Sequence, residues 1–585
     1  MAEFTSSNAL ADALRAARRH LWAAALFSGL VNLLYLAPSL FMLQVYDRVV
    51  PTRGGATLVA LIVVLVVALA VFAVLDLVRM RLLLRASVRL EKLAAPVILD
   101  RVLGMGNVTP VERIMALRNF DTIRGTLTGP AIVALFDAPW TPIYVLVCFM
   151  LHAWIGALAI AAMVILTVIA LAGERATRPG IAMAGASGGG VARSQDYSVG
   201  AAEVARVLGM RGALVRRHLA ERATVVARQG EVAAMSGGFL AATKFLRMLF
   251  QSLALALGAW LAVQQSISAG AIFAASLLVG RALQPVEQIL GAWKNVTGAR
   301  IAYLGLSAFL TRDHGTISRT ALPDPQGRVE ITGVTVKAPD GDRMILSDIS
   351  FAVEAGEIIA LVGPSGAGKS TLLRTLAGAI EPDVGEVRFD GASLADWDRE
   401  ALGHHLGYLP QTPSLFPASV HANISRFHAM PVDGGAAIDA QVIDAAKRAG
   451  AHETILRFPQ GYDTILAIRE GGGLSAGQRQ LVALARALFG RPRILLLDEP
   501  NAHLDMNGEA MLTELLKQAR AAGITVIVST HRTGLLHVAD RILMLRDGRV
   551  QFLKSREEAM RPQQEPGHAN PVVTTRQAPA GAPGR

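Results

Sequence analysis

Six long apolar segments constrain the fold of this chain more than any other feature of its sequence. Each is long enough to cross about 30 Å of hydrocarbon as a helix. They lie near residues 21–45, 57–78, 131–151, 154–173, 245–264 and 268–288. The sequence therefore predicts an all-α membrane half with six spans, extending over residues 21–310.

The distribution of basic residues orients these spans. The connections after spans two and four are rich in arginine, from Arg79 to Arg124 and from Arg175 to Arg228. The short turns around His152 and between Gln264 and Gly270 carry no lysine or arginine. By the positive-inside rule, both termini, including residues 1–20, and both long connections are cytoplasmic. We expect a retained first span in place of a cleaved signal, because the run is long and no cleavage pattern precedes Tyr46.

The two long connections have largely helical patterns of ~50 to 70 residues, whereas the external turns are short. We therefore expect helices that extend well below the membrane. The glycine-rich run at 185–190 predicts a kink or a short break in the second of these arms. Asp76, Asp137, Lys244 and Arg247 lie in or near spans, where a functional role is the default hypothesis, but all are close enough to a span end to snorkel or cap.

Composition supports a protein in contact with a lipid bilayer. Hydrophobic residues make up 52% of the chain and charged residues 18%, with a net charge of +11. The arginines flank apolar runs instead of forming one basic tail, so anionic lipid headgroups explain the charge better than nucleic acid does. Cys148 is the one cysteine and lies in an apolar run, so the chain forms no internal disulfide.

The sequence pattern of the carboxyl-terminal part predicts a second folding unit. Residues 311–326 are polar and rich in turn formers, which is typical of a linker. From 327 to 554, strand-like apolar runs alternate with helical patterns, which predicts an α/β domain. The last segment, 555–585, is rich in Pro, Gln, Gly and Arg with few apolar anchors, and we expect it to be disordered.

A glycine-rich motif carries the strongest chemical signal. It follows the apolar run 358–362 and precedes a helical pattern, which is the context of a phosphate-binding loop. Backbone N–H groups of such a loop surround phosphate oxygens, the lysine reaches the β and γ phosphates, and the serine after it ligates Mg²⁺. The motif consists of Gly363, Pro364, Ser365, Gly366, Ala367, Gly368, Lys369, Ser370 and Thr371. ATP and Mg²⁺ are the expected ligands.

Two acidic residues support this interpretation. Asp498 and Glu499 end the buried-strand run 494–497, at the sheet edge where ligands bind. Alone, they would be ordinary acidic residues at a strand end. Together with the phosphate loop, they predict a magnesium ligand in Asp498 and a residue that orients the attacking water in Glu499.

The run Leu474–Gln478, LSAGQ, resembles the LSGGQ signature of ATP-binding cassette (ABC) proteins. The resemblance implies that Ser475, Gly477 and Gln478 contact ATP held by the phosphate loop of a second copy, so the protein would act as a homodimer. Ala476 stands where the family usually has glycine, a small change that spares the backbone contacts.

Further positions match the same family by order and context. The resemblance implies that Gln411, in YLPQTPSLF, contacts the metal and links it to the membrane half. It implies that His531 holds the γ-phosphate and that Asp505 lies at the dimer seam. Family members often stack an aromatic ring on adenine, whereas this chain has Ala338 at the corresponding position.

The membrane half is similar to that of type I protein-secretion transporters, and most similar to the PrtD-like protease and lipase exporters. The likeness covers residues 20–553 and includes the runs FMLQVYDRVVPTR, LFDAPWTP and AAEVARVLGM, and the variant acidic motif DEPNAHLD. It implies an ATP-driven exporter in the bacterial inner membrane that moves an unfolded polypeptide with a C-terminal signal. A periplasmic adaptor and an outer-membrane channel are the implied partners. About 20 residues precede the first span, so we expect no amino-terminal peptidase domain like that of leader-cleaving relatives.

Two other functions fit the same architecture. A homodimeric lipid or drug exporter would show ATP hydrolysis stimulated by amphiphiles without an adaptor. A membrane-anchored sensor would bind ATP without steady hydrolysis, and Glu499 and His531 favour turnover over this alternative.

Overall fold

The computed structural model divides into two compact units, Met1–His314 and Gly315–Arg585. It describes residues 9–105, 108–312, 322–338, 341, 343–428, 435–467 and 473–560. The carboxyl-terminal tail beyond 560 and most of the expected linker lie outside the described residues. We describe each unit by itself.

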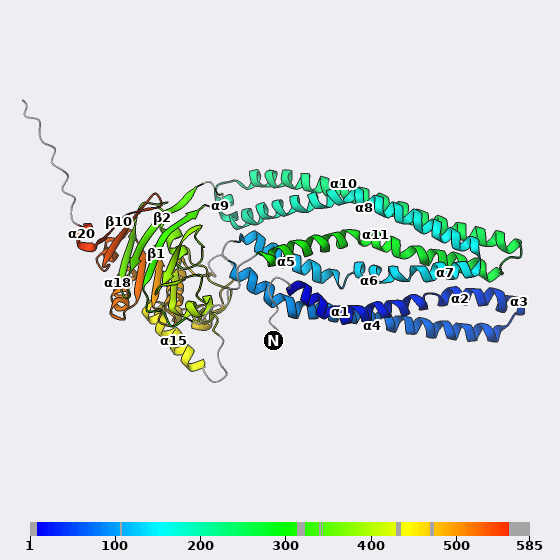
Figure 1. Cartoon of the computed structure of the whole chain (residues 1–585), viewed down its shortest axis with the longest axis horizontal. Helices are drawn as coiled ribbons and strands as arrows, with labels where there is room; N and C mark the ends of the chain where they lie inside the picture. Colours follow the sequence, from blue (N-terminus) through cyan, green and yellow to red (C-terminus); the bar gives the residue numbers. More distant parts are fainter. Residues whose placement is uncertain are drawn as a thin grey trace, which may run out of the picture. The chain divides into compact units, whose positions relative to one another are not determined.

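The first unit is entirely helical in its described part, and six of its helical stretches are long and apolar enough to cross a membrane (Figure 1). These six stretches agree in number and in position with the six predicted spans. The elements are α1 (Ala9–Leu34), α2 (Ala37–Gln44), η1 (Val45–Val49), α3 (Val50–Thr52), α4 (Gly55–Gly104), α5 (Pro110–Thr126), α6 (Pro130–Asp137), η2 (Ala138–Trp140), α7 (Thr141–Leu151), α8 (Ala153–Gly200), α9 (Ala202–Val207), α10 (Arg211–Val263) and α11 (Ala269–Thr311).

Helices α4, α8 and α10 have 50, 48 and 53 residues. At 1.5 Å per residue each is more than 70 Å long, which is more than twice the ~30 Å thickness of the hydrocarbon core. The predicted arms beyond the membrane follow directly from these lengths.

The predicted break at residues 185–190 is wrong, because α8 runs without interruption from Ala153 to Gly200. Its helical neighbour α10 packs along it, as Figure 1 shows. At two other glycines of α8 this packing is close: a Cβ on Gly173 would lie 2.9 Å from the Phe239 ring, and one on Gly180 would lie 2.6 Å from Val232. At Gly173 and Gly180, packing of this kind offsets the ~1 kcal/mol by which a helical glycine is less favourable than alanine.

Two of the spans are composite. The first changes from α1 to α2 beside Pro38, and the third changes from α6 to α7 through a single 3₁₀ turn that contains Pro139. These prolines stand in the first turn of a new helical segment, where the missing N–H has no intrahelical partner to lose.

Two apolar cores hold the first unit together. One lies among α7, α8, α10 and α11 and is centred on Tyr144, Cys148 and Leu283. The other joins the beginning of α1, the end of α4, α5 and the end of α11 around Leu90, Phe120 and Leu306.

The second unit contains two sheets flanked by helices, which confirms the predicted α/β domain. Its strands are β1 (Val329–Lys337), β2 (Met344–Val353), β3 (Ile358–Val362), β4 (Val384–Phe389), β5 (Ala392–Ser393), β6 (Leu406–Leu409), β7 (Ile494–Asp498), β8 (Thr525–Ser529), β9 (Arg541–Arg546) and β10 (Arg549–Ser555). Its helices are α12 (Lys369–Leu376), α13 (Arg399–His405), α14 (Val420–Ile424), α15 (Gly435–Arg448), α16 (His452–Leu456), η3 (Gly461–Asp463), α17 (Ala476–Leu488), α18 (Met506–Ala521), α19 (Thr533–Leu536) and α20 (Arg556–Met560).

The larger sheet has the order β10-β9-β3-β8-β7-β6, with all neighbours parallel except the β10–β9 pair. Its central strands β3, β7 and β8 are buried almost throughout, as their unbroken apolar sequences predict. The smaller antiparallel sheet has the order β2-β1-β4-β5. One core lies between the two sheets, and a second lies between the larger sheet and α15, α17 and α18. The residues 556–560, which we expected in a disordered tail, form α20.

Candidate nucleotide and transport sites

The phosphate-loop motif connects β3 to α12, in the strand–loop–helix order that its sequence predicts. Gly363 has a positive φ of 154°, and a Cβ there would overlap the carbonyl oxygen of Leu545. Gly368 also has a positive φ, of 98°, and lies against Leu346. Glycine is therefore required at both positions for the loop to reach the first turn of α12. The side chain of Ala367 packs in the core between the sheets, whereas Pro364, Ser365 and Gly366 are exposed.

The side chain of Lys369 lies inside this loop. Its Nζ donates to the carbonyl oxygens of Gly363 and Pro364, at 2.7 and 3.1 Å. Burial lowers the pKa of Lys369, while the carboxylates of Glu499 and Asp498 act in the opposite direction. The loop thus holds a cation next to two acidic groups at the end of β7.

Asp498 is a buried carboxylate without a full set of partners. It is 2% exposed, and its Oδ1 has no hydrogen-bond partner among the described residues. Burial raises the pKa of Asp498 and the neighbouring charge of Glu499 acts in the same direction, whereas hydrogen bonding from Ser370 lowers it. An acceptor oxygen without a partner is unusual inside a protein and is often explained by a bound ion. The oxygen donors around this position fit a hard divalent cation such as Mg²⁺.

Three predicted site residues come together at the carboxyl ends of neighbouring strands. Gln411 follows β6, Glu499 follows β7 and His531 follows β8. The Nε2 of Gln411 donates to one carboxylate oxygen of Glu499 at 3.3 Å, and the Nε2 of His531 lies 3.5 Å from the other. Glu499 has a φ of +47°, and its N–H donates to the carbonyl oxygen of Ser529. Strained backbone at such a position is typical of functional sites.

The signature residues form a separate element of the same unit. Ser475 caps the amino terminus of α17: its Oγ accepts from the N–H of Gln478, whose Oε1 in turn accepts from the N–H of Ser475. A Cβ on Gly477 would lie 2.9 Å from the carbonyl oxygen of His503, so this glycine allows a close backbone approach. Among the described residues, neither Ser475 nor Gln478 forms a hydrogen bond or an ion pair with the phosphate loop of the same chain.

Two other expected residues have simple local surroundings. Asp505 caps α18, where its carboxylate accepts from the N–H of Gly508 at 2.8 Å. Ala338 is buried at the end of β1 and has no ring to offer to a base. Several of its neighbours in the 339–342 turn lie outside the described residues.

The membrane unit contains a buried polar network that the sequence pattern does not predict. Asp76 and Asp137 were expected to snorkel or cap, yet Arg79 is buried between them and forms ion pairs with both. Asn32 donates to the same oxygen of Asp137 at 2.8 Å, and the hydroxyl of Tyr144 donates to Asn32. Sequence offered one signal, namely opposite charges in different spans. The pairing itself depends on which helices pack together.

Known proteins resemble this chain over most of its length. A family model described as "ABC transporter" matches residues 346–502. The type I secretion system ATP-binding protein PrsD of Rhizobium meliloti (strain 1021) is 38% identical over 571 residues, 95% of each chain. The cyclolysin secretion/processing ATP-binding protein CyaB of Bordetella pertussis is 29% identical over 549 residues, which are 92% of this chain and 76% of CyaB.

A solved structure of a bacterial Atm1-family ABC exporter with ATP bound matches the fold. The TM-score is 0.79 at 23% identity, and the match covers 93% of this chain and 96% of the exporter. Together with the sequence relatives, the matched fold establishes a nucleotide-binding ABC protein that couples ATP hydrolysis to transport. Because the likeness to PrsD extends over both units, this chain belongs to the family of type I secretion ABC transporters.

Proposed function

We propose that this protein is the ATP-driven component of a bacterial type I secretion system, located in the inner membrane, and that it exports a polypeptide with a C-terminal signal. The observation that carries the proposal is the 38% identity to a type I secretion protein over 95% of the chain. A periplasmic adaptor and an outer-membrane channel would complete the export path. The membrane half would comprise residues 21–310 and the nucleotide-binding domain residues 327–554, joined by the linker 311–326.

In the nucleotide-binding domain, the backbone of residues 363–371 and the Lys369 ammonium would bind the phosphates of ATP. Asp498, Ser370 and Gln411 would hold Mg²⁺, and the Oδ1 of Asp498, which lacks a protein partner, supports this assignment. Bound Mg²⁺ supplies charge neutralisation at the β and γ phosphates.

Glu499 would position the water that attacks the γ-phosphate. Its carboxylate lies between Gln411 and His531, which restrict its orientation from both sides. In this arrangement His531 also supplies a donor for the γ-phosphate. Glutamine in place of Glu499 would preserve the size of the side chain but remove the charge that orients the water.

Two copies of the chain would form two nucleotide sites, each completed by Ser475, Gly477 and Gln478 of the partner subunit. The capped amino terminus of α17 supports this proposal, because helix amino termini bind anions well. The lack of any described contact between these residues and the phosphate loop of the same chain is in keeping with a site shared between copies.

A secretion assay tests the proposed function. Cells would produce the chain with an adaptor, a channel and an amino-terminally tagged protein that carries a C-terminal secretion signal. We expect the tagged protein in the medium with the wild-type chain, and none with Glu499→Gln or when the signal is deleted. Equal secretion by Glu499→Gln would refute ATP-driven export. ATP hydrolysis that responds to lipids or drugs, with no secretion by the wild type, would favour the lipid or drug exporter.

A further inference from the structure

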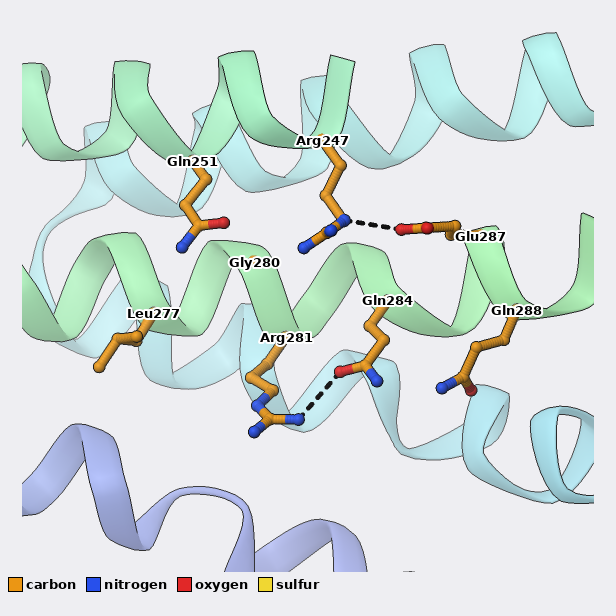
Figure 2. A pocket seen from close by; sticks show the side chains of 8 residues that line it. All are labelled: Arg247, Gln251, Leu277, Gly280, Arg281, Gln284, Glu287 and Gln288. Carbon is orange, nitrogen blue, oxygen red and sulfur yellow. Dashed lines mark hydrogen bonds and ion pairs between the residues drawn. The ribbon is translucent and has the colours of Figure 1, made fainter. Parts of the chain in front are cut away.

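A polar cavity of about 410 Å³ lies between α10 and α11 of the membrane unit. Figure 2 shows Arg247 and Gln251 pointing from α10 towards α11, with Glu287 beside Arg247, whereas Arg281 and Gln284 project from the side of α11 that faces away from α10. Gly280 forms part of the wall: a Cβ there would lie 3.0 Å from the Oε1 of Gln251, so glycine leaves room for this amide between the helices. We call this cavity the Arg281 cavity.

The Arg281 cavity lies at membrane depth. Arg281 is about 18 Å, and Glu287 about 27 Å, along α11 from its beginning at Ala269. The hydrocarbon core is ~30 Å thick, so these charged groups are within or at the boundary of the apolar layer. Ionisable residues at such depths face the interior of a bundle or a water-filled space, and they mark functional sites by default.

The polar surface continues along α11 beyond the cavity. Arg281, Gln284, Gln288 and Asn295 follow one another at intervals of three, four and seven residues and so share one face of the helix. Gln288 also lines a second cavity, together with Asn295, Asp76 and Arg79. This polar face of α11 is incompatible with lipid and suits an aqueous path through the membrane unit.

The two arginines of the Arg281 cavity differ in whether they have an acidic partner. The Nε of Arg247 lies 2.6 Å from a carboxylate oxygen of Glu287, so this arginine is already neutralised. Arg281 donates one hydrogen bond to Gln284 at 2.9 Å, and its guanidinium lies over the ring of Tyr35, 4.3 Å from the centroid. Within the described part of the chain, its other N–H groups have no hydrogen-bond acceptor and no acidic partner. The cavity therefore contains one uncompensated cation with several free donors.

We propose that the Arg281 cavity binds carboxylate groups of the exported polypeptide as it crosses the membrane unit. A guanidinium offers two parallel N–H donors that match a carboxylate, and in a low-dielectric site such a pair is stronger than in water. Tyr35 holds the guanidinium plane from one side, and the amides of Gln251 and Gln288 provide further polar contacts. The inference rests on the proposed function, because it identifies acidic segments of a polypeptide as the preferred cargo of that path.

Peptide binding to the full-length protein in nanodiscs of zwitterionic lipid tests the inference. The probes are a fluorescent peptide rich in glutamate and its counterpart with glutamine at the same positions. We expect the glutamate peptide to bind at least ~10-fold more tightly, a preference that corresponds to about 1.4 kcal/mol for one charged pair. Arg281→Gln abolishes the preference, and Arg281→Lys retains part of it, because lysine keeps the charge but not the planar pair of donors.

Arg300→Gln is the matched control, since it removes one exposed positive charge from the same helix outside the cavity. This variant keeps both the peptide preference and the basal ATP hydrolysis. Equal binding of the two peptides to the wild type overturns the proposal, as does an unchanged preference in Arg281→Gln. A short-chain anionic lipid provides a further test. If it displaces the glutamate peptide and binds Arg281→Gln as tightly as it binds the wild type, the anion site lies elsewhere and the proposal is overturned.

Export separates this inference from the proposed function. If the wild-type chain secretes its substrate but Arg281→Gln retains the wild-type preference for the glutamate peptide, the proposed role of the Arg281 cavity is disproved and export is not. A wild-type chain that secretes no polypeptide disproves export, even where the glutamate peptide binds at Arg281.

Discussion

Two buried aspartates in this protein have opposite surroundings. Asp137, in the membrane unit, is 7% exposed, and its Oδ1 accepts hydrogen bonds from Arg79 and Asn32. Asp498, in the nucleotide-binding unit, is 2% exposed, and its Oδ1 has no hydrogen-bond partner among the described residues. The first carboxylate is neutralised by its own fold, whereas the second retains an acceptor oxygen without a protein partner.

The difference shows how a buried charge can be assigned to stability or to chemistry. A carboxylate paired within the protein stabilises a particular helix arrangement, and its removal leaves the partner charge without compensation. A carboxylate without a partner destabilises the empty protein and is retained for its ligand. The two residues should therefore respond oppositely to the same kind of substitution.

The largest expected effect follows from Asp498→Asn. Loss of the carboxylate weakens the proposed magnesium site, and we expect ATP hydrolysis to fall by about 1000-fold, in line with the several kcal/mol that a metal ion contributes to such reactions. Steady-state hydrolysis by the purified full-length protein measures the effect. Activity within ten-fold of wild type at saturating Mg²⁺ would remove Asp498 from the metal site.

Asp137→Ala should instead affect stability. Arg79 keeps its ion pair with Asp76 but loses its buried partner, and the expected loss of unfolding free energy is about 3 kcal/mol. Thermal unfolding in detergent checks the effect, and basal ATP hydrolysis per folded molecule should be unchanged. Wild-type stability of Asp137→Ala would mean that the two aspartates do not differ as we argue.

The pH dependence of stability sharpens the comparison at Asp498. Its pKa is raised above 3.8 mainly by burial, so the folded protein binds this proton more tightly than the unfolded chain does. Stability in the absence of metal should therefore decrease as the pH rises from about 4 through the raised pKa. The Asp498→Asn variant should not show this decrease in stability, because asparagine has no proton to release. Its melting temperature in a chelator should exceed that of the wild type at pH 7, with the difference disappearing in acid.

The smallest expected effect concerns two helix caps. Ser475 caps α17 and Ser419 caps α14, each by accepting a backbone N–H. Alanine at either position should lower stability by about 1 kcal/mol. Only Ser475→Ala should also impair ATP hydrolysis, because Ser475 alone has a proposed second role at the partner's nucleotide. Equal hydrolysis by the two variants would limit Ser475 to its capping role.

Some parts of the site could be predicted from sequence because they depend on short-range geometry. The phosphate loop needs glycine where φ is positive and a helix directly after it, and both requirements lie within nine consecutive residues. Glu499 could be predicted from its place after a buried strand, and Gln411 and His531 from the family resemblance. Their contacts follow from the parallel order of β6, β7 and β8.

Other features depended on long-range packing and could not be read along the chain. Helix α8 continues through its glycine-rich run, although the local sequence favours a break there. Its packing against α10, close at Gly173 and Gly180, is not specified by sequence periodicity. Arg79, Asp137 and Asn32 belong to three different helices, and their network forms only when α1, α4 and α6 pack together.

Three features could be predicted from the residues alone: six apolar segments, a phosphate loop that joins a strand to a helix, and the difference in kind between the two regions. These features arise from hydrophobic length and local backbone geometry, which depend on neighbouring residues. Packing determines which charged groups are neutralised and which remain available, as at Asp498 and Arg281. Charge compensation is a property of distances between helices and strands that are remote in sequence, so only the packed fold specifies it.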